Sequence, residues 1–199
     1  MNNTVGSLTQ RQLSIIIGSV LGDGYLRIIE GRNDAFLEVN HSIKAKDYVL
    51  WKYSELESIC KSGPKERVID EQRTAYRFFT KQHPELTKIF KEFYVDGRKI
   101  IPKIDLDELM LAVWYMDDGS KTNKGDVYLN TQQFSMNDQK KLLYALRNLG
   151  IKARLNKDKK YYRIRILKES IAHFNKLISP YIVESMRYKL SYDPVETYS

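Results

Sequence analysis

The sequence predicts an α+β fold in which one αββαββα unit occurs twice. Two long apolar helices each end in Asp-Gly, and each is followed by the same order of hairpins and helices. Four residue pairs keep a nearly constant spacing: Asp23 and Asp118 lie 95 residues apart, Asn40 and Asn130 lie 90 apart, Tyr76 and Tyr162 lie 86 apart, and Lys99 and Lys189 lie 90 apart. Because these spacings drift only by loop lengths, we interpret the chain as a duplication.

The helix predicted over residues 105–119 reads DLDELMLAVWYMDDG and is apolar around most of its circumference, so we expect it to be buried. Asp105 or Asp107 can cap its first turn. Gly119 is expected to adopt the left-handed conformation that closes many helices. Asp117 and Asp118 stand at the negative pole of the helix dipole, where carboxylates are unfavourable, so their presence indicates a neighbouring cation.

A second helix of this kind is predicted within residues 8–24 and ends at Asp23-Gly24. Ser7 and Gln10 are expected to form its capping box. Gly18 and Gly22 share one face and permit another backbone to approach closely. A single Asp-Gly helix end is usually an ordinary turn, so it is the second occurrence that indicates a functional motif. If the two helices pack side by side, their acids meet and can hold Mg²⁺.

Both stretches resemble the LAGLIDADG motif of homing endonucleases. Residues 16–24 read IIGSVLGDG and residues 111–119 read LAVWYMDDG. Two motifs in one chain are typical of the family's single-chain, monomeric members. The resemblance implies two antiparallel saddle-like sheets with the motif helices packed at the centre. The second motif carries Val113 and Asp117 where the family has small residues, so we do not expect the helix packing to be symmetric.

The remaining elements follow the same order in each half, which we divide at residues 1–101 and 102–199. Hairpins are predicted at 25–29 with 36–41, at 66–69 with 75–80, after Gly119 with a return strand at 127–134, and at 153–155 with 161–167. Helices are predicted at 44–60, from Pro84 onward, at 136–149 and at 170–178, and a loop is predicted at 96–102.

The composition favours a polyanionic partner. Lysine and arginine total 33 against 25 acids, a net charge of +8, which is typical of proteins that bind nucleic acid but also occurs in merely soluble basic proteins. Cys60 is the only cysteine, which excludes intrachain disulfides and zinc ribbons. No apolar run reaches the ~18 residues of a membrane helix, and the start is not a signal peptide. We therefore expect an intracellular protein of a prokaryote or an organelle, encoded within an intron.

The paired acids predict phosphodiester hydrolysis. Asp23 and Asp118 are the candidate catalytic carboxylates and Mg²⁺ ligands, with Mn²⁺ as a substitute, and the carbonyls of Gly22 and Asp117 at the helix ends are candidate further ligands. In the family a basic residue stands near each active site, and Lys99 and Lys189 occupy matching places; they are otherwise surface lysines. No Walker loop, nucleophile elbow or HExxH motif supports another chemistry.

Polar side chains alternate along the predicted strands and are candidates for contacts in a DNA major groove, where Arg pairs with guanine and Asn or Gln with adenine. The other interpretation is that they form a solvated sheet face. The candidates are Arg27, Arg32, Glu38, Asn40, His41, Lys44, Arg67, Arg73, Arg77, Lys121, Asn130, Gln132, Arg154, Lys159, Arg163 and Arg165.

The resulting hypothesis is a monomeric, site-specific endonuclease for double-stranded DNA that promotes intron mobility. The resemblance implies a long asymmetric target and a staggered cut with 3′ overhangs. Two alternatives remain open: an RNA maturase that assists splicing of its host intron, and a catalytically silent DNA-binding protein of the same fold. Either alternative makes the acids dispensable.

Overall fold

The computed structural model describes residues 6–191 of the chain, which forms two compact units, one through Lys91 and one from Glu92 onward. The two halves predicted from the sequence repeat, 1–101 and 102–199, stay a prediction. Among the described residues, no helix has both the length and the apolar character needed to cross a membrane.

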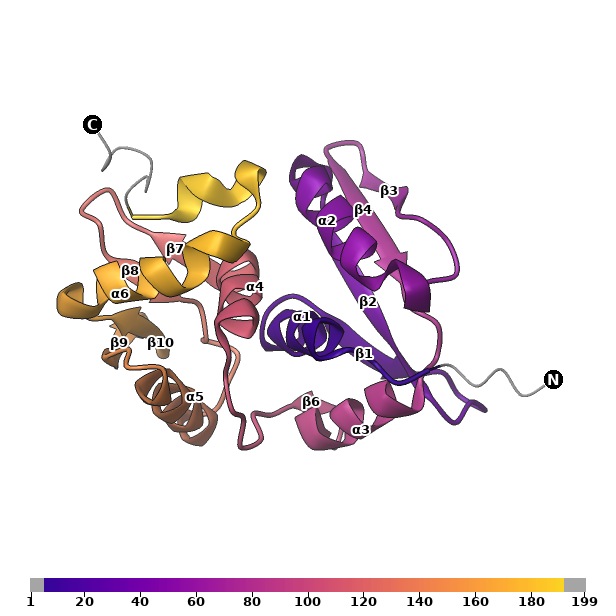
Figure 1. The fold of residues 1–199 in the computed structure, drawn as a ribbon, viewed down its shortest axis with the longest axis horizontal. Helices are drawn as coiled ribbons and strands as arrows, with labels where there is room; N and C mark the ends of the chain where they lie inside the picture. The colour runs from indigo at the N-terminus through magenta and orange to yellow at the C-terminus, as the bar shows by residue number, and fades with distance from the viewer. Residues whose placement is uncertain (1–5, 192–199) are drawn as a thin grey trace. The chain divides into compact units, whose positions relative to one another are not determined.

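The first unit has the order helix, hairpin, helix, hairpin, helix (Figure 1). Its elements are α1 (Gln10–Leu21), β1 (Tyr25–Ile28), β2 (Ala35–Ser42), α2 (Lys46–Leu56), β3 (Lys65–Asp70), β4 (Arg73–Phe79) and α3 (Pro84–Phe93). The strands form an antiparallel sheet in the order β1-β2-β4-β3, and α2 packs against β2 and β4. Short 3-10 helices, η1 (Ile43–Ala45) and η2 (Glu57–Ile59), flank α2. η2 lies within the predicted 44–60 segment, and η1 begins one residue before it.

The second unit repeats that connectivity. Its elements are α4 (Glu108–Asp118), β7 (Gly119–Lys121), β8 (Val127–Leu129), α5 (Met136–Asn148), β9 (Ala153–Asp158), β10 (Tyr161–Ile166) and α6 (Lys168–Ile178). The sheet order is β7-β8-β10-β9, which matches β1-β2-β4-β3 strand for strand. The predicted α+β fold with two antiparallel sheets in duplicated αββαββα units is therefore confirmed.

Several details differ from the prediction. The capping box of α1 is formed by Thr9 and Gln12, not by Ser7 and Gln10. Both pairs have the required spacing, but the buried Leu8 donates its N–H to Glu85 Oε1 at 3.1 Å, which fixes the chain just before Thr9.

The predicted loop at 96–102 contains a small ribbon of β5 (Tyr94–Val95) and β6 (Arg98–Lys99). Its turn residues, Asp96 and Gly97, have φ angles of 49° and 73°, the left-handed pair that a tight two-residue hairpin requires. After α6 come two further 3-10 helices, η3 (Ser179–Tyr181) and η4 (Glu184–Lys189), neither of which was predicted.

Helix α4 is buried on nearly every side, as its all-round apolar sequence predicts. Every residue from Leu109 to Met116 is buried, and Asp107 caps the helix by accepting the N–H of Met110 at 2.7 Å. Tyr115 packs edge-on against Phe174 of α6, with ring centroids 5.1 Å apart. A helix that is apolar on nearly every side is expected to be buried, as α4 is.

Candidate active site and nucleic-acid surface

Asp23 projects from a tight turn that closes α1. The carbonyl of Ser19 accepts the N–H groups of both Gly22, at 3.1 Å, and Gly24, at 2.7 Å. A β carbon on Gly24 would lie 2.7 Å from that same carbonyl oxygen, so only glycine fits this position. The Asp23 side chain is 50% exposed, which leaves the carboxylate available to a ligand from solvent.

His41 is an ionisable neighbour of Asp23 within the first unit. Its Nδ1 lies 3.6 Å from Asp23 Oδ2, and only 10% of its side chain is exposed. The imidazole packs against the buried ring of Tyr48 on α2, with centroids 5.3 Å apart. The ammonium of the buried Lys52 lies 4.5 Å from the centre of the same ring. The imidazole thus has a fixed orientation toward the carboxylate.

His41 and Asn40 were both predicted as DNA contacts, and in the structure they lie on opposite faces of β2. Strand alternation puts Val39 and His41 on the helix-covered side and Glu38 and Asn40 on the other. That alternation was visible in the sequence and could have separated His41 from its neighbours. Tyr48 and Lys52 were not predicted as site residues, because their contacts near His41 depend on which side of α2 packs against β2.

In the second unit, Lys189 reaches the C-terminal end of the motif helix α4. Its Nζ donates to the carbonyls of Met116 and, at 3.3 Å, of Asp117. In return, the hydroxyl of Tyr115 donates to the Lys189 carbonyl at 2.6 Å. A cation is favoured at this end of a helix, because it meets carbonyls that have no partner in the next turn.

This contact bears on the candidate metal ligands. The Asp117 carbonyl, expected as a ligand, already accepts a hydrogen bond from Lys189. A carbonyl oxygen has two lone pairs and can accept more than one partner. The positive charge of Lys189 therefore lies beside the acids at the end of α4.

Asp118 is the last residue of α4, whereas α1 ends two residues before Asp23. The Asp118 carbonyl accepts the N–H of Asn130 at 3.0 Å, and β7 begins at the next residue, Gly119. Gly119 was expected in the left-handed region but has φ −77° and ψ 147°. Glycine is required there for another reason: any β carbon would collide with the ring and carbonyl of Tyr115.

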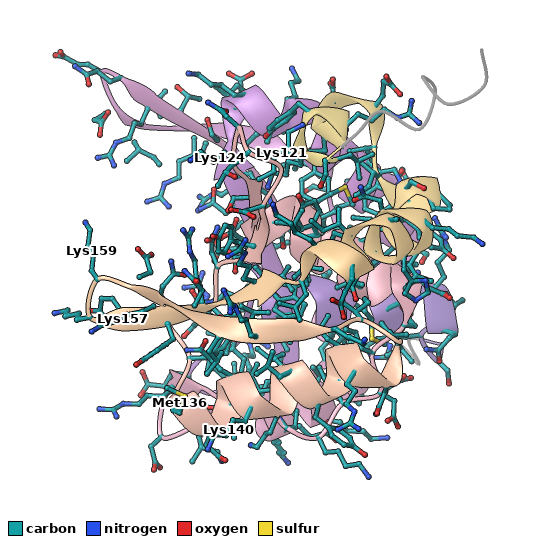
Figure 2. The ribbon with its side chains drawn as sticks, turned by 90° about the vertical axis from the view of Figure 1, so that its left-hand side faces the viewer. Lys121, Lys124, Met136, Lys140, Lys157 and Lys159 are labelled. Carbon is teal, nitrogen blue, oxygen red and sulfur yellow. The ribbon has the colours of Figure 1, made fainter. Side chains whose placement is uncertain are left out.

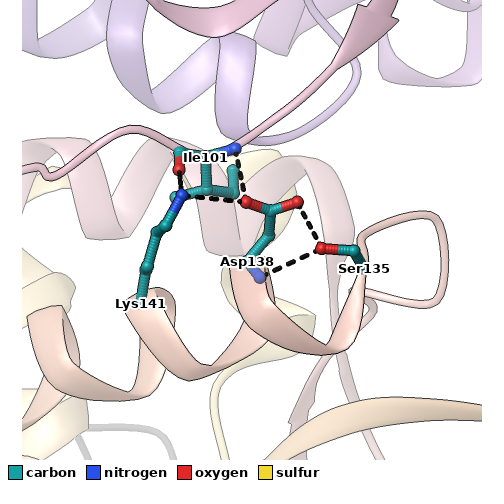
Figure 3. A network of polar contacts seen from close by, with 4 residues as sticks. All are labelled: Ile101, Ser135, Asp138 and Lys141. Carbon is teal, nitrogen blue, oxygen red and sulfur yellow. Dashed lines mark hydrogen bonds and ion pairs between the residues drawn. The ribbon is translucent and has the colours of Figure 1, made fainter.

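Lys99 lies on β6, two residues before a segment that a polar network fixes to α5 (Figure 3). Asp138 Oδ1 accepts the N–H of Ile101 at 3.2 Å, and Lys141 donates to the Ile101 carbonyl at 2.5 Å. Lys141 also pairs with Asp138 at 3.2 Å, and Ser135 donates to Asp138 Oδ2 at 2.6 Å. Burial alone would raise the pKa of Asp138, but these hydrogen bonds from Ser135, Ile101 and Lys141 lower it below its usual value.

The open face of the first sheet carries a preorganised polar cluster. Glu38 accepts from Arg27 at 2.6 Å and lies 3.8 Å from Arg77. Each guanidinium also lies over an aromatic ring, Arg27 over Phe36 at 5.5 Å and Arg77 over Phe79 at 5.1 Å. The ion pairs and ring contacts restrict the orientations of the two guanidinium groups, which favours bidentate contacts with a partner.

The second sheet presents a different set on its equivalent face. Arg163 lies 3.9 Å above the Tyr128 ring and donates to Asn130 at 3.4 Å, while Arg165 pairs with Asp126 at 2.5 Å. Gln132 donates to Asp158 at 2.8 Å. Lys121 differs from the other candidates, because its ammonium is bonded to the Leu190 carbonyl.

The other candidates lie on exposed positions of strands, turns and η1. Figure 2 shows Lys157 and Lys159 at the far end of the β9–β10 hairpin, and Lys121 and Lys124 at the β7–β8 end. Arg73 pairs with Asp70 at 2.6 Å. Those exposed without an ion pair among the described residues are Arg32, Lys44, Arg67, Arg154 and Lys159.

Comparison with known proteins places the chain among homing endonucleases and maturases. It is 33% identical to the cytochrome b mRNA maturase bI2 of Saccharomyces cerevisiae over 96% of this chain, and spans about half (49%) of that relative's length. The bI2 maturase of Debaryomyces hansenii is 30% identical over 92% of this chain and 74% of the relative. The DNA endonuclease I-ChuI of Chlamydomonas applanata is 30% identical over 93% of this chain and 96% of its own.

A solved structure supports the same relationship. The homing endonuclease I-WcaI, bound to its DNA recognition sequence, superposes with a TM-score of 0.86 at 25% identity, covering 94% of this chain and 89% of the other. The sequence model of the LAGLIDADG DNA endonuclease family matches residues 13–174, which include both Asp-Gly helix ends. With two motifs in one chain and that match over most of its length, this protein belongs to the LAGLIDADG DNA endonuclease family.

Proposed function

We propose that this protein is a site-specific endonuclease for double-stranded DNA that hydrolyses one phosphodiester in each strand and promotes the mobility of its intron. One observation carries the proposal: each duplicated unit presents an acid at the end of its motif helix, with a basic or imidazole side chain fixed beside it. One chain supplies both half-sites, so we expect it to act as a monomer.

The donor set suits a hard divalent cation. The carboxylates of Asp23 and Asp118, with carbonyl oxygens at the helix ends, are the ligands that Mg²⁺ prefers, and Mn²⁺ accepts the same ligands. When bound, such an ion would supply an activated water and offset the charge that develops on the leaving oxygen. The carbonyls of Gly22 and Asp117, the second of which also accepts a hydrogen bond from Lys189, are the further candidate ligands.

The protein's own residues have separate tasks in this proposal. His41 holds the Asp23 carboxylate in one orientation through the contact at Oδ2. Lys189 places a positive charge at the end of α4, where it offsets the negative charge of the phosphate undergoing attack. Lys99 is proposed for the same task at the cut in the other DNA strand, since it occupies the matching position in the sequence repeat.

The two open sheet faces support recognition of an asymmetric target. The first face offers a Glu38 between two arginines, and the second offers Arg163 with Asn130 and Arg165 with Asp126. Because the two sets differ, we expect the two half-targets to differ in sequence. Cleavage is expected to be staggered and to leave 3′ overhangs. Since the proposed substrate is genomic DNA, we expect the protein in the compartment of a prokaryote or organelle that holds it.

The test is cleavage of a plasmid that carries the uninterrupted junction of the proposed host intron. We expect a linear product with Mg²⁺ and none with EDTA. Asp23→Asn and Asp118→Asn should each abolish the linear product while DNA binding in a gel-shift assay persists. A wild-type protein that binds the junction but never cuts it would instead support the catalytically silent alternative.

A second function is supported by the relatives named maturases, one of which is 33% identical over 96% of this chain. We propose that the protein also assists the splicing of its own intron RNA. Splicing of the precursor transcript in vitro, with and without the protein at increasing concentration, tests this. We expect a higher splicing rate at low Mg²⁺, and Asp23→Asn should retain it, because the nuclease acids have no part in splicing.

A further inference from the structure

The outer face of α5 carries two shallow grooves that share one exposed aromatic side chain. One groove, of about 520 Å³, is lined by Leu143, Tyr144, Arg147, Ile151, Lys152 and Ala153. The other, of about 310 Å³, is lined by Lys103, Ile104, Asn137, Lys140, Lys141 and Tyr144. Tyr144 stands between them with 59% of its surface exposed. We call this region the α5 surface.

The α5 surface faces away from the sheet that carries the proposed DNA contacts. Leu142 and Leu146 of α5 are buried, and α5 packs against β9 and β10, where Ile164 and Ile166 are also buried. Arg163, with Arg165, alternates with those isoleucines and therefore lies on the opposite side of the sheet. Figure 2 shows Lys140 and Met136 along α5, apart from Lys157 and Lys159 at the hairpin end.

The charge of this surface is one-sided. Five lysines and arginines line the two grooves, and no aspartate or glutamate does. Two of the five are already paired, Lys141 with Asp138 and Lys152 with Glu169. Among the described residues no ion pair involves Lys103, Lys140 or Arg147. Three cations therefore remain for a polyanion.

The shape favours a single strand over a duplex. Grooves of a few hundred Å³ have the size of sites for small molecules, so each holds a unit of a strand. The floors are apolar, with Leu143, Ile151 and Ile104, and an exposed tyrosine between them can stack on an unpaired base. Sequence-specific recognition of RNA uses such aromatic platforms on unpaired loops, whereas a duplex keeps its bases stacked inside.

We propose that the α5 surface binds single-stranded segments of RNA, with Tyr144 stacking on a base and Lys103, Lys140 and Arg147 binding the flanking phosphates. This inference rests on the second function proposed above and gives it a location: RNA on the α5 side of the second unit, DNA on the open sheet face. The two ligands then use separate surfaces of the same unit.

The test measures binding by the full-length protein with fluorescence anisotropy. The probe is an oligouridine RNA of about 20 nucleotides, longer than the ~4–16 nucleotides of common single-strand sites. An oligothymidine DNA and a DNA duplex of equal length are the comparison probes. Tyr144→Ala should weaken RNA binding about tenfold, within the range for the loss of one stacked base, and Tyr144→Phe should stay within about twofold of wild type.

Charge reversal gives the second arm. Lys140→Glu should weaken RNA binding and reduce the slope of log affinity against log salt by about 0.7 or more, the value for one neutralised phosphate on a single strand. Lys176→Glu, an exposed lysine on α6 with the same change in net charge, is the matched control and should leave the slope unchanged. Neither Tyr144→Ala nor Lys140→Glu should alter affinity for the duplex.

The outcomes separate this inference from the maturase function. RNA binding that survives Tyr144→Ala, or that Lys176→Glu weakens equally, overturns the α5 surface. Equal affinity for the oligothymidine with the same dependence on Tyr144 overturns the assignment to RNA. If the protein accelerates splicing and Tyr144→Ala does not affect the rate, the maturase function is supported and RNA binding by the α5 surface is overturned. If RNA binding depends on Tyr144 but the protein does not accelerate splicing, RNA binding by the α5 surface is supported and the maturase function is overturned.

Discussion

The two Asp-Gly helix ends of this protein read alike but are supported differently. Asp23 stands in a tight turn after α1, beside the imidazole of His41, which is held by a tyrosine on α2. Asp118 continues the helix α4, whose end is bound by Lys189 from η4, far along the chain. A duplicated motif thus keeps its acid while the surrounding side chains diverge, so we expect the two halves to contribute unequally to the proposed cleavage.

The largest expected effects come from the acids. Asp23→Asn and Asp118→Asn should each lower the cleavage rate by about 10³-fold or more, above the usual cost of one electrostatic group because metal binding is lost as well. Asp117→Asn is the neighbouring control and should retain measurable cleavage. Rates come from single-turnover digestion of a labelled target. If Asp117→Asn were the inactive variant and Asp118→Asn the active one, the assignment of the second acid would move by one residue.

Substitution of Lys99 or Lys189 should affect the cleavage rates of the two DNA strands differently. Lys189→Met should slow one strand about 10²-fold and leave the other nearly unchanged, so nicked DNA should accumulate. Lys99→Met should produce the complementary nick. Denaturing gels with each strand labelled separately give the two rates, and Lys189→Arg, which keeps the charge, should recover part of the loss. Equal slowing of both strands by either variant would contradict separate half-sites.

His41 should act through Asp23 and not through DNA affinity. His41→Ala should lower the cleavage rate about tenfold, the lower end of the cost of losing a group that orients a metal ligand, and should weaken Mn²⁺ binding measured by calorimetry. His41→Gln should recover part of both. Asn40→Ala, one residue away on the opposite face of β2, should instead weaken DNA binding and leave Mn²⁺ binding intact. A reversal of these two patterns would place His41 at the DNA.

Asp138 should affect stability more than cleavage. Asp138→Asn should cost about 1–3 kcal/mol, because it disturbs the bonds to Ser135, Lys141 and the Ile101 N–H. Asn137→Ala, its exposed neighbour, should change stability by less than about 0.5 kcal/mol. Urea unfolding gives both values.

The same aspartate predicts a pH dependence. Because its pKa is lowered in the folded protein, its contribution is present above its unfolded pKa of about 3.9 and is lost as pH falls through the lower folded value. The difference in unfolding free energy between wild type and Asp138→Asn should therefore be full at neutral pH and shrink below about pH 4. A difference that grew with acidification would contradict the lowered pKa.

Much of the fold was predictable because the repeat doubles every local signal. The order of helices and hairpins and the buried character of α4 follow from periodicity and spacing. The equivalence of Lys99 and Lys189 stays a prediction from the repeat. The capping residue of α1 was not predictable, since Ser7 and Thr9 both precede a glutamine by three positions and a distant Glu85 decides between them. Strands of two residues, as in β5 and β6, are too short to leave a pattern.

The site was less predictable than the fold. Which lysine belongs to the second motif could be proposed from the repeat, but its bonds to the α4 carbonyls depend on η4, for which the sequence offers no helical signal. Gly119 illustrates the same limit: its place was evident, but the reason is the ring of Tyr115, a side chain one helical turn earlier. Side-chain contacts of this kind follow from packing and not from residue type.

The segment after α6 contacts both the motif helix α4 and the strand β7. Lys189 binds the end of α4, and the following carbonyl, that of Leu190, accepts a hydrogen bond from Lys121 of β7. A premature stop codon just beyond Tyr181 would therefore delete one catalytic candidate while sparing every strand of both sheets. We expect such a truncated form to lose the charge of Lys189 at the end of α4 and therefore to cut one strand of the target much more slowly than the other.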